Sequence, residues 1–302
     1  MKILKENNLE NYDLAIVGIG YESRAITIFE DKKDQIHKTI SIGYKEFNTE
    51  LSYEKNKLLY KNSNAKIIEK NDSDLFKELK EIIRNEYSSE PIKCLLDITV
   101  MSRTRLATVL MILIENLKEK SNIKICYELA KFTPPSNEVS PIRKIGPIIS
   151  SLSGSLGNIE LPSSIVIGLG YELGKAIGIS NYLDAELQFS IFPRSTDKDF
   201  ERYVESNNNT LLESIPNNFK FNYEVSNPYK SYLELRELVL AITKISRPIV
   251  VPLGPKILSA IFIILSKEFN YSLPVWRVSS EHNELPVDRK PSGEMVELNL
   301  EI

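Results

Sequence analysis

The sequence Leu14-Ala-Ile-Val-Gly-Ile-Gly-Tyr-Glu22 returns almost unchanged as Ile165-Val-Ile-Gly-Leu-Gly-Tyr-Glu172 in the second half of the chain. Each copy is a short apolar run rich in β-branched residues, followed by Gly-x-Gly-Tyr-Glu and then by a helical pattern. This order predicts a strand, a tight turn and a helix. Because the motif occurs once in each half, the two halves are predicted to be duplicates of one another.

A second pair of strands, each running into an apolar helix, follows at Ile92–Arg103 and at Ile249–Lys256. Strands and helices alternate through both halves, which indicates parallel pairing with helices on both faces of each sheet. The predicted fold class is α/β, with two tandem Rossmann-like parallel-sheet modules related by internal duplication. We place the modules at residues 1–150 and 151–302, joined through a stretch rich in Pro, Ser and Gly at 134–162.

Three finer predictions complete this outline of the fold. Ser73 is expected to cap the helix that runs to about Tyr87. Residues 145–152, which lie inside the linker, are expected to pair with another segment. Residues 295–302 alternate apolar and polar side chains, which predicts an edge strand or a hairpin arm.

Composition limits the function classes. The chain has 302 residues, of which 42% are hydrophobic and 26% charged, as in a globular protein with a sizeable core. A formal charge of −3 argues against a general nucleic-acid-binding surface. No apolar run is long enough to cross a bilayer and no signal peptide begins the chain, so no membrane partner and a cytoplasmic location are expected. Cys94 and Cys126 lie in apolar strand patterns and are expected to be buried free thiols.

The two turns of each half are expected to meet. In an open α/β sheet the first and fourth strands lie side by side where the winding reverses, and ligands bind outside their carboxyl ends. Glycines there allow close approach of a ligand or a positive φ, and helix N-termini favour anions. The expected ligand-binding residues are Gly18, Gly20, Tyr21, Glu22, Arg24, Asp97, Thr99, Ser102 and Arg103 in the first half, and Gly168, Gly170, Tyr171, Glu172, Gly254 and Lys256 in the second.

These residue types have alternative roles. The arginines and Lys256 suit phosphate oxygens, but a charge at a helix start is also an ordinary solvated residue. Glu22 and Glu172 suit a helix start through the helix dipole as well as a binding role. Tyr21 and Tyr171 are able to stack on a base or to pack in the core.

The dinucleotide-binding fingerprint is incomplete. It requires a third glycine where this chain has Ser23 and Leu173, and only the first half offers an acid, up to Glu46, at the end of the second strand. A Walker phosphate loop is absent from the sequence. No resident cofactor is expected.

Conventional catalysis has little support. His37 precedes its strand, at the amino end of the sheet, away from the expected binding site. His282 follows the last strand, at the carboxyl end, where the site is expected. No group of His, Cys, Asp or Glu residues in the sequence has the spacing of metal ligands, so no metal site is expected. The catalytic residues are unknown, and whether the chain is an enzyme stays open, with a binding role preferred.

The segment Asp97-Ile-Thr-Val-Met-Ser-Arg103 resembles the strand-four signature of CARF domains, the Rossmann-like sensors of cyclic oligonucleotides in antiviral defence. Asp97, Thr99 and Arg103 fit its spacing. In the second half Lys256 fits, but Pro252 or Val250 stands in place of the acid. Two such modules in one chain resemble SAVED domains, which are similar to fused CARF pairs.

This resemblance implies a ligand-binding component of a bacterial antiviral (antiphage) system. The ligand would be a nucleotide or cyclic oligonucleotide, and a protein effector partner would give the output. The alternatives are a nucleotide-processing enzyme, such as a ring-opening phosphodiesterase or a nucleotide hydrolase, and a structural adaptor without a ligand.

Overall fold

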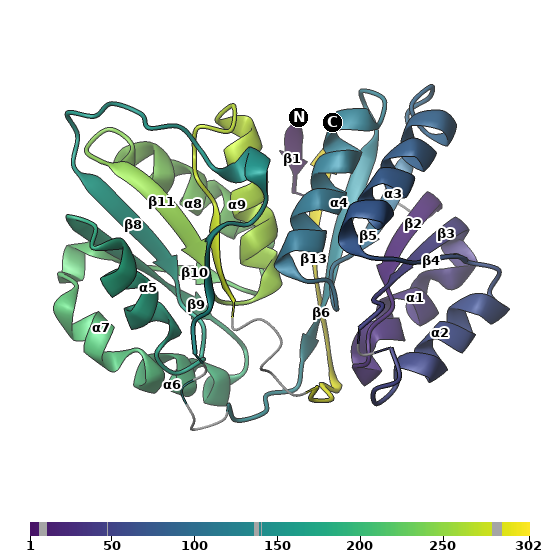
Figure 1. Ribbon diagram of the computed structural model, residues 1–302, viewed down its shortest axis with the longest axis horizontal. Helices are drawn as coiled ribbons and strands as arrows, with labels where there is room; N and C mark the ends of the chain where they lie inside the picture. The colour runs from purple at the N-terminus through teal and green to yellow at the C-terminus, as the bar shows by residue number, and fades with distance from the viewer. Residues whose placement is uncertain (6–10, 47, 136–138, 140, 280–285) are drawn as a thin grey trace. The chain divides into compact units, whose positions relative to one another are not determined.

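A computed structural model describes residues 1–5, 11–46, 48–135, 139, 141–279 and 286–302 (Figure 1). The chain divides into two compact units, and each is described by itself. Unit 1 comprises Met1–Lys131 with Pro286–Ile302, and unit 2 comprises Phe132–Leu285. Both are α/β units with mostly parallel sheets, as the sequence predicts.

The elements of unit 1 follow the predicted alternation closely. The strands are β1 (Lys2–Leu4), β2 (Tyr12–Gly18), β3 (Ile36–Gly43), β4 (Lys66–Glu69), β5 (Lys93–Asp97), β6 (Asn122–Ala130) and β13 (Pro291–Glu301). The α-helices are α1 (Thr27–Lys32), α2 (Tyr53–Asn62), α3 (Asp72–Glu86) and α4 (Arg103–Asn116), with 3-10 helices η1 (Ser23–Ile26) and η2 (Lys33–Gln35) on either side of α1.

The sheet of unit 1 has the order β1-β13-β6-β5-β2-β3-β4. The strands from β6 to β4 are parallel, and β2 pairs with both β3 and β5, so the winding direction reverses between β2 and β5. The C-terminal strand β13 is antiparallel to β6, with Leu298 opposite Ile125, and β1 covers its other side. The predicted edge strand at 295–302 is therefore an interior strand.

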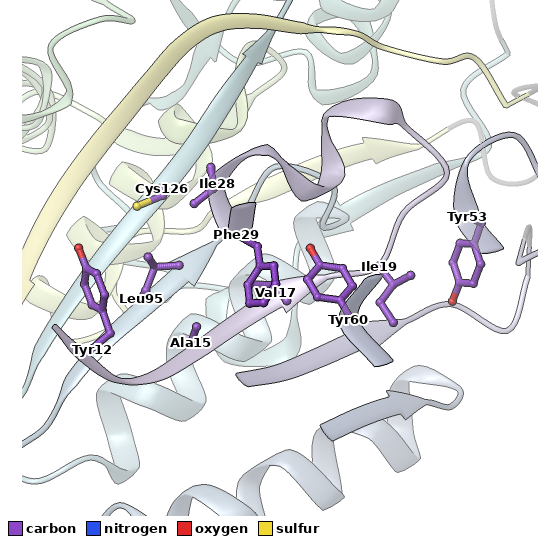
Figure 2. Close-up of a cluster of buried hydrophobic side chains, with 10 residues drawn as sticks. All are labelled: Tyr12, Ala15, Val17, Ile19, Ile28, Phe29, Tyr53, Tyr60, Leu95 and Cys126. Carbon is purple, nitrogen blue, oxygen red and sulfur yellow. The ribbon is translucent and has the colours of Figure 1, made fainter. Parts of the chain in front are cut away.

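Helices cover both faces of this sheet (Figure 1). Alternate residues of β2 point to opposite faces, so Ala15, Val17 and Ile19 lie toward α1 and α2. Figure 2 shows the cluster that they form there with residues of α1, α2, β5 and β6, all of them buried. Its members are Tyr12, Ala15, Val17, Ile19, Ile28, Phe29, Tyr53, Tyr60, Leu95 and Cys126.

Unit 2 repeats the same winding. Its strands are β7 (Lys144–Pro147), β8 (Ser163–Gly168), β9 (Leu187–Arg194), β10 (Lys220–Glu224), β11 (Arg247–Pro252) and β12 (Trp276–Ser279). Its helices are α5 (Lys175–Leu183), α6 (Lys198–Asn207), α7 (Asn209–Ser214), α8 (Pro228–Ile242) and α9 (Lys256–Glu268), with 3-10 helices η3 (Ser150–Leu152) and η4 (Asn217–Phe219).

The parallel sheet of unit 2 has the order β10-β9-β8-β11. Val275 adds a parallel bridge to Val250 of β11, and the residues that follow form β12, which pairs antiparallel with β7. The pairing expected for residues 145–152 is thus found. In both units an antiparallel strand lies next to the fifth parallel position of the sheet. In unit 1 this strand is β13, from the C-terminal segment, and in unit 2 it is β7, from the predicted linker.

The pairings of β7 and β13 correct the predicted domain boundary. A division at 150/151 assigns β7 to the first module and β13 to the second. The strand pairing assigns them the other way round, because β13 continues the sheet of unit 1 and β7 pairs with β12. Local sequence patterns do not reveal which distant strand a segment pairs with.

Short polar side chains cap the two longest helices of unit 1. Asn71, and not the predicted Ser73, caps α3, because its side chain accepts from the N–H of Asp74 at 2.9 Å. Ser102 caps α4 by accepting from the N–H of Arg105 at 3.2 Å. Such caps bind N–H groups that the helix itself leaves unpaired. Among the described residues, no helix is long and apolar enough to span a membrane.

Candidate functional site

The two turns predicted to belong together are in direct contact in unit 1. A Cβ built on Gly18 would lie 2.8 Å from Cγ2 of Val100, and one built on Gly20 would lie 2.8 Å from its Cβ. Neither glycine has a positive φ. Both glycines are therefore needed for close packing of the turn after β2 against the turn after β5.

The first turn is held by α2. Asn56 donates from its side-chain amide to the carbonyl oxygens of Gly20 and Glu22, at 2.8 and 3.0 Å. The N–H of Ser52 donates to the carbonyl of Tyr21 at 3.0 Å. The Tyr21 side chain itself packs against the buried cluster of Figure 2. The backbone of the turn is thus preorganised.

The same device recurs in unit 2. Asn208 donates to the carbonyl oxygen of Gly170 at 2.8 Å, and its neighbour Asn207 donates to that of Tyr171 at 2.6 Å. The ring of Tyr171 packs edge-on against Phe132 and Phe200. Asn56 and Asn208 were not among the residues expected from the sequence. Each follows the second strand of its own unit, at a similar distance along the chain from the glycines of that unit.

Arg24, an expected ligand contact, is engaged within the protein. It is 3% exposed, and its Nε lies 2.6 Å from the Glu22 carboxylate. Its Nη1 donates to the carbonyl oxygen of Glu128 at 2.7 Å. The guanidinium therefore positions Glu22, whose side chain stays 13% exposed at the turn.

The second turn is held by its own side chains. Asp97 is buried and accepts from the N–H of Thr99 at 2.8 Å. The Thr99 hydroxyl accepts from the N–H of Glu128, at the end of β6, at 3.1 Å. The Glu128 carboxylate accepts from the N–H of Gly293 at 2.9 Å, and burial raises its pKa. Glu128 lies near the carboxyl end of β6 and was not among the expected site residues.

Arg105 joins the second turn to the end of β3. It is 2% exposed, its Nε lies 2.8 Å from Asp72, and its Nη1 donates to the carbonyl of Gly43 at 2.7 Å. Its guanidinium carbon lies 3.5 Å from the ring centroid of Tyr44. The Tyr44 hydroxyl accepts from the N–H of Ser102 at 2.8 Å. Arg103, beside it, begins α4 and is only partly buried.

A third polar group lies at the ends of β3 and β4. The hydroxyl of Tyr53 donates to Glu69 at 2.6 Å and accepts from the N–H of Tyr44 at 3.1 Å. Lys57 pairs with the other oxygen of Glu69 at 2.6 Å. Burial acts to raise the pKa of Glu69, but the hydrogen bonds from Lys57 and Tyr53 outweigh it and lower that pKa below its ordinary value.

We expect Glu69→Gln to destabilise unit 1 by up to about 1 kcal/mol at neutral pH, since the ion pair is partly exposed. A carboxyl group whose pKa is lowered on folding stabilises above its unfolded pKa, here 4.5, and loses that contribution as the pH falls further. The difference in urea-unfolding free energy between the two proteins should therefore shrink in acid. Glu81→Gln, on the exposed face of α3, is the control, and a gap that widens below pH 4.5 would contradict the expectation.

In unit 2 the two corresponding turns meet through their backbones. A Cβ on Gly170 would lie 2.7 Å from the carbonyl oxygen of Leu253, and one on Gly254 would lie 2.6 Å from that of Leu169, so backbone meets backbone. Gly168 packs instead against the side chain of Leu258 of α9. Lys256 begins α9, and Pro255 precedes it without a side-chain cap.

Glu172 is partly buried, with one carboxylate oxygen close to Gly170. The expected ligand roles of Glu172, Lys256 and the unit 2 glycines stay predictions.

The structure places both cysteines and one of the two histidines. Cys94 and Cys126 are buried free thiols, as predicted, and burial raises the pKa of both. His37 is exposed at the amino edge of the unit 1 sheet, in a groove of about 500 Å³ that Lys33, Lys66 and Tyr87 also line. His282 lies outside the described residues. Within the described ranges, no three His, Cys, Asp or Glu side chains gather closely enough to hold a metal ion.

Comparisons with known proteins give few matches. No protein-family model matches the chain, and no curated protein does. Among solved structures, it is similar to the O-methyltransferase of a trans-AT PKS multienzyme from Brevibacillus brevis, in complex with S-adenosyl-L-homocysteine. The identity is 12%, the coverage 89% of this chain and 82% of that one, and the TM-score 0.24.

A second similar structure is phosphoethanolamine N-methyltransferase 1 of Haemonchus contortus, in complex with phosphoethanolamine and S-adenosylhomocysteine. Here the identity is 8%, the coverage 98% of this chain and 89% of that one, and the TM-score 0.27. Both comparisons concern the α/β fold alone.

The expected role in antiviral defence is corrected here. The two solved structures described above are methyltransferases and not cyclic-oligonucleotide sensors. In addition, Arg24, one of the residues expected to contact a phosphate, is bound to Glu22 and Glu128. We therefore withdraw the sensor and, with it, the nucleotide-processing enzyme and the adaptor that were its alternatives. The resemblance of Asp97–Arg103 to CARF domains stays a prediction.

Proposed function

We propose that unit 1 binds a small molecule of the nucleoside type at the carboxyl ends of β2 and β5. The observation that carries the proposal is the contact between the two turns at the point where the strand order reverses. Open α/β sheets bind ligands at such points. The turns are held rigid by Asn56, Asp97 and Thr99, so a ligand meets a preformed surface.

The chemistry of this edge favours hydroxyl or amino groups as partners. The carboxylate of Glu22 is partly exposed at the first turn, and Arg24 fixes its direction. Glu46 follows β3, at the end of the second strand, where an acid binds the ribose hydroxyls in dinucleotide folds. A carboxylate accepts hydrogen bonds strongly from hydroxyl and amino groups. A ribose with an attached base offers both.

The test is calorimetry of the full chain with adenosine, guanosine, cytidine, uridine and S-adenosylhomocysteine. We expect at least one of them to bind, and Glu22→Gln to weaken its binding about tenfold, or 1.4 kcal/mol. Glu172→Gln, the matched position in unit 2, should leave that affinity unchanged. Thermal unfolding of both variants checks that they fold.

Two outcomes would overturn the proposal. One is that none of the five compounds binds. The other is that Glu172→Gln weakens binding while Glu22→Gln does not, which would place the ligand in unit 2.

A further inference from the structure

The first helical N–H group of unit 1 already has an anionic partner. The N–H of Ser23, at the start of η1, donates to Oδ1 of Asp288 at 2.7 Å. The Ser23 hydroxyl donates to the carbonyl oxygen of Arg289 at 3.4 Å. Asp288 stands in the segment before β13, far away in sequence. A ligand phosphate at this N–H would have to displace a carboxylate of the protein itself.

The glycine backbone is also covered. In nucleotide-binding turns the absence of a Cβ allows phosphate to approach the backbone. Here the side chain of Val100 takes that space, within 2.8–3.1 Å of where a Cβ on Gly20 would be. Val100 is only partly buried, so a ligand meets an apolar group at this point instead of a row of N–H donors.

The charges around the turn add to this exclusion. Arg24 and Arg105 are at most 3% exposed, and each is paired with a carboxylate of the protein. Glu22 and Asp288 lie on either side of Ser23, and Glu22 is already paired with Arg24. A phosphate brought to the N–H of Ser23 would be repelled by the charge of Asp288, and repulsion of this kind is screened by salt.

We infer that the site in unit 1 accepts an unphosphorylated nucleoside and rejects its 5′-phosphate, with Asp288 and Val100 as the residues that determine this specificity. The inference rests on the proposed function, and it names the ligand class of the same site. Asp288 acts by charge at the N–H of Ser23. Val100 acts by its shape over the two glycines.

The test is a comparison of each nucleoside with its 5′-monophosphate by calorimetry, on the full chain at two salt concentrations. We expect the nucleoside to bind at least tenfold more tightly than the monophosphate at low salt, and the ratio to narrow as salt is raised. Asp288→Asn keeps an oxygen that accepts from Ser23 but removes the charge. This variant should lower the ratio of nucleoside affinity to monophosphate affinity at least threefold, while the nucleoside affinity itself changes less than twofold.

Val100→Ala should narrow the ratio further, at both salt concentrations, because it acts by shape. Asp199→Asn removes an exposed carboxylate from unit 2 and is the charge control, with no expected effect on the ratio. A monophosphate that binds as tightly as its nucleoside, or a ratio unchanged in Asp288→Asn, would overturn the inference but leave the proposed function in place. Absence of binding by nucleosides and monophosphates alike would overturn the proposed function itself.

Discussion

Arg105→Met is expected to destabilise unit 1 by about 2–3 kcal/mol, a large share of the stability of an ordinary domain. The guanidinium of Arg105 is 2% exposed and bonds to Asp72 and to the carbonyl of Gly43. Methionine fills much of the volume but leaves that carbonyl without its donor, and it removes the charge that stacks on Tyr44. Each buried polar group left unsatisfied is costly.

The measurement is urea unfolding followed by circular dichroism, with hydrogen exchange of the peptides that span α4 and β3 to locate the change. Arg105→Lys should fall between the wild type and Arg105→Met, because a lysine keeps the charge but not the planar fork. Arg84→Met is the control. It removes an exposed arginine of α3 that bonds to Asn116, and we expect a change of about 0.5 kcal/mol or less. An Arg105→Met protein as stable as Arg84→Met would contradict this account of the buried network.

The case of Arg105 shows where prediction from sequence ends. The apolar helix that starts near Arg103 was predicted, since the apolar run there leaves little choice. The burial of Arg105 was not, because the partners Asp72 and Gly43 come from other elements, and only the strand order brings them together. The same holds for Arg24, whose acceptor at Glu128 lies across the sheet. From the sequence, Arg24 was expected to contact a phosphate or to be a solvated charge at a helix start, and not to be buried in an ion pair.

The duplicated motif was the most informative part of the sequence. It predicted the adjacency of β2 with β5 and of β8 with β11, and both pairs are found. It did not predict the purpose of the glycines. A glycine that makes room for a ligand cannot be distinguished in a sequence from a glycine that makes room for a neighbouring side chain. The contact with Val100 decides between them, and it also explains why the proposed ligand is unlike the phosphate that the motif suggests.

The exchange of β7 and β13 between the units has a similar cause. Both strands have an alternating or short apolar pattern that fits several edges of a sheet. Their partners are selected by side-chain packing against β6 and β12, which no local pattern records. A consequence is that unit 1 needs the C-terminus of the chain to complete its sheet. Asp288 reaches Ser23 for the same reason, so the proposed specificity depends on a segment that the predicted boundary assigned to the other half.

Gly20→Ala is expected to destabilise unit 1 by about 1–3 kcal/mol, as overpacking does. The added Cβ would lie 2.8–3.1 Å from three carbon atoms of Val100, closer than van der Waals contact allows. Val100→Ala removes Cγ1 and Cγ2 but keeps the Cβ at 2.8 Å, so it should relieve only part of the cost in the double variant. The quantity to measure is the coupling free energy in a double-mutant cycle of the two positions, from urea unfolding.

Gly170→Ala is the matched variant in unit 2, where the added Cβ meets the carbonyl oxygen of Leu253 at 2.7 Å. Truncating a side chain cannot move a backbone atom, so no single substitution at Leu253 should rescue it. Gly178→Ala is the control for glycine replacement itself, since it lies in α5 and faces only the flexible end of Ile142. We expect it to be neutral or to stabilise by up to about 1 kcal/mol through helix propensity. Additive effects at Gly20 and Val100 would mean that the two turns of unit 1 are not packed as described, and that the ligand has access to the glycine backbone after all.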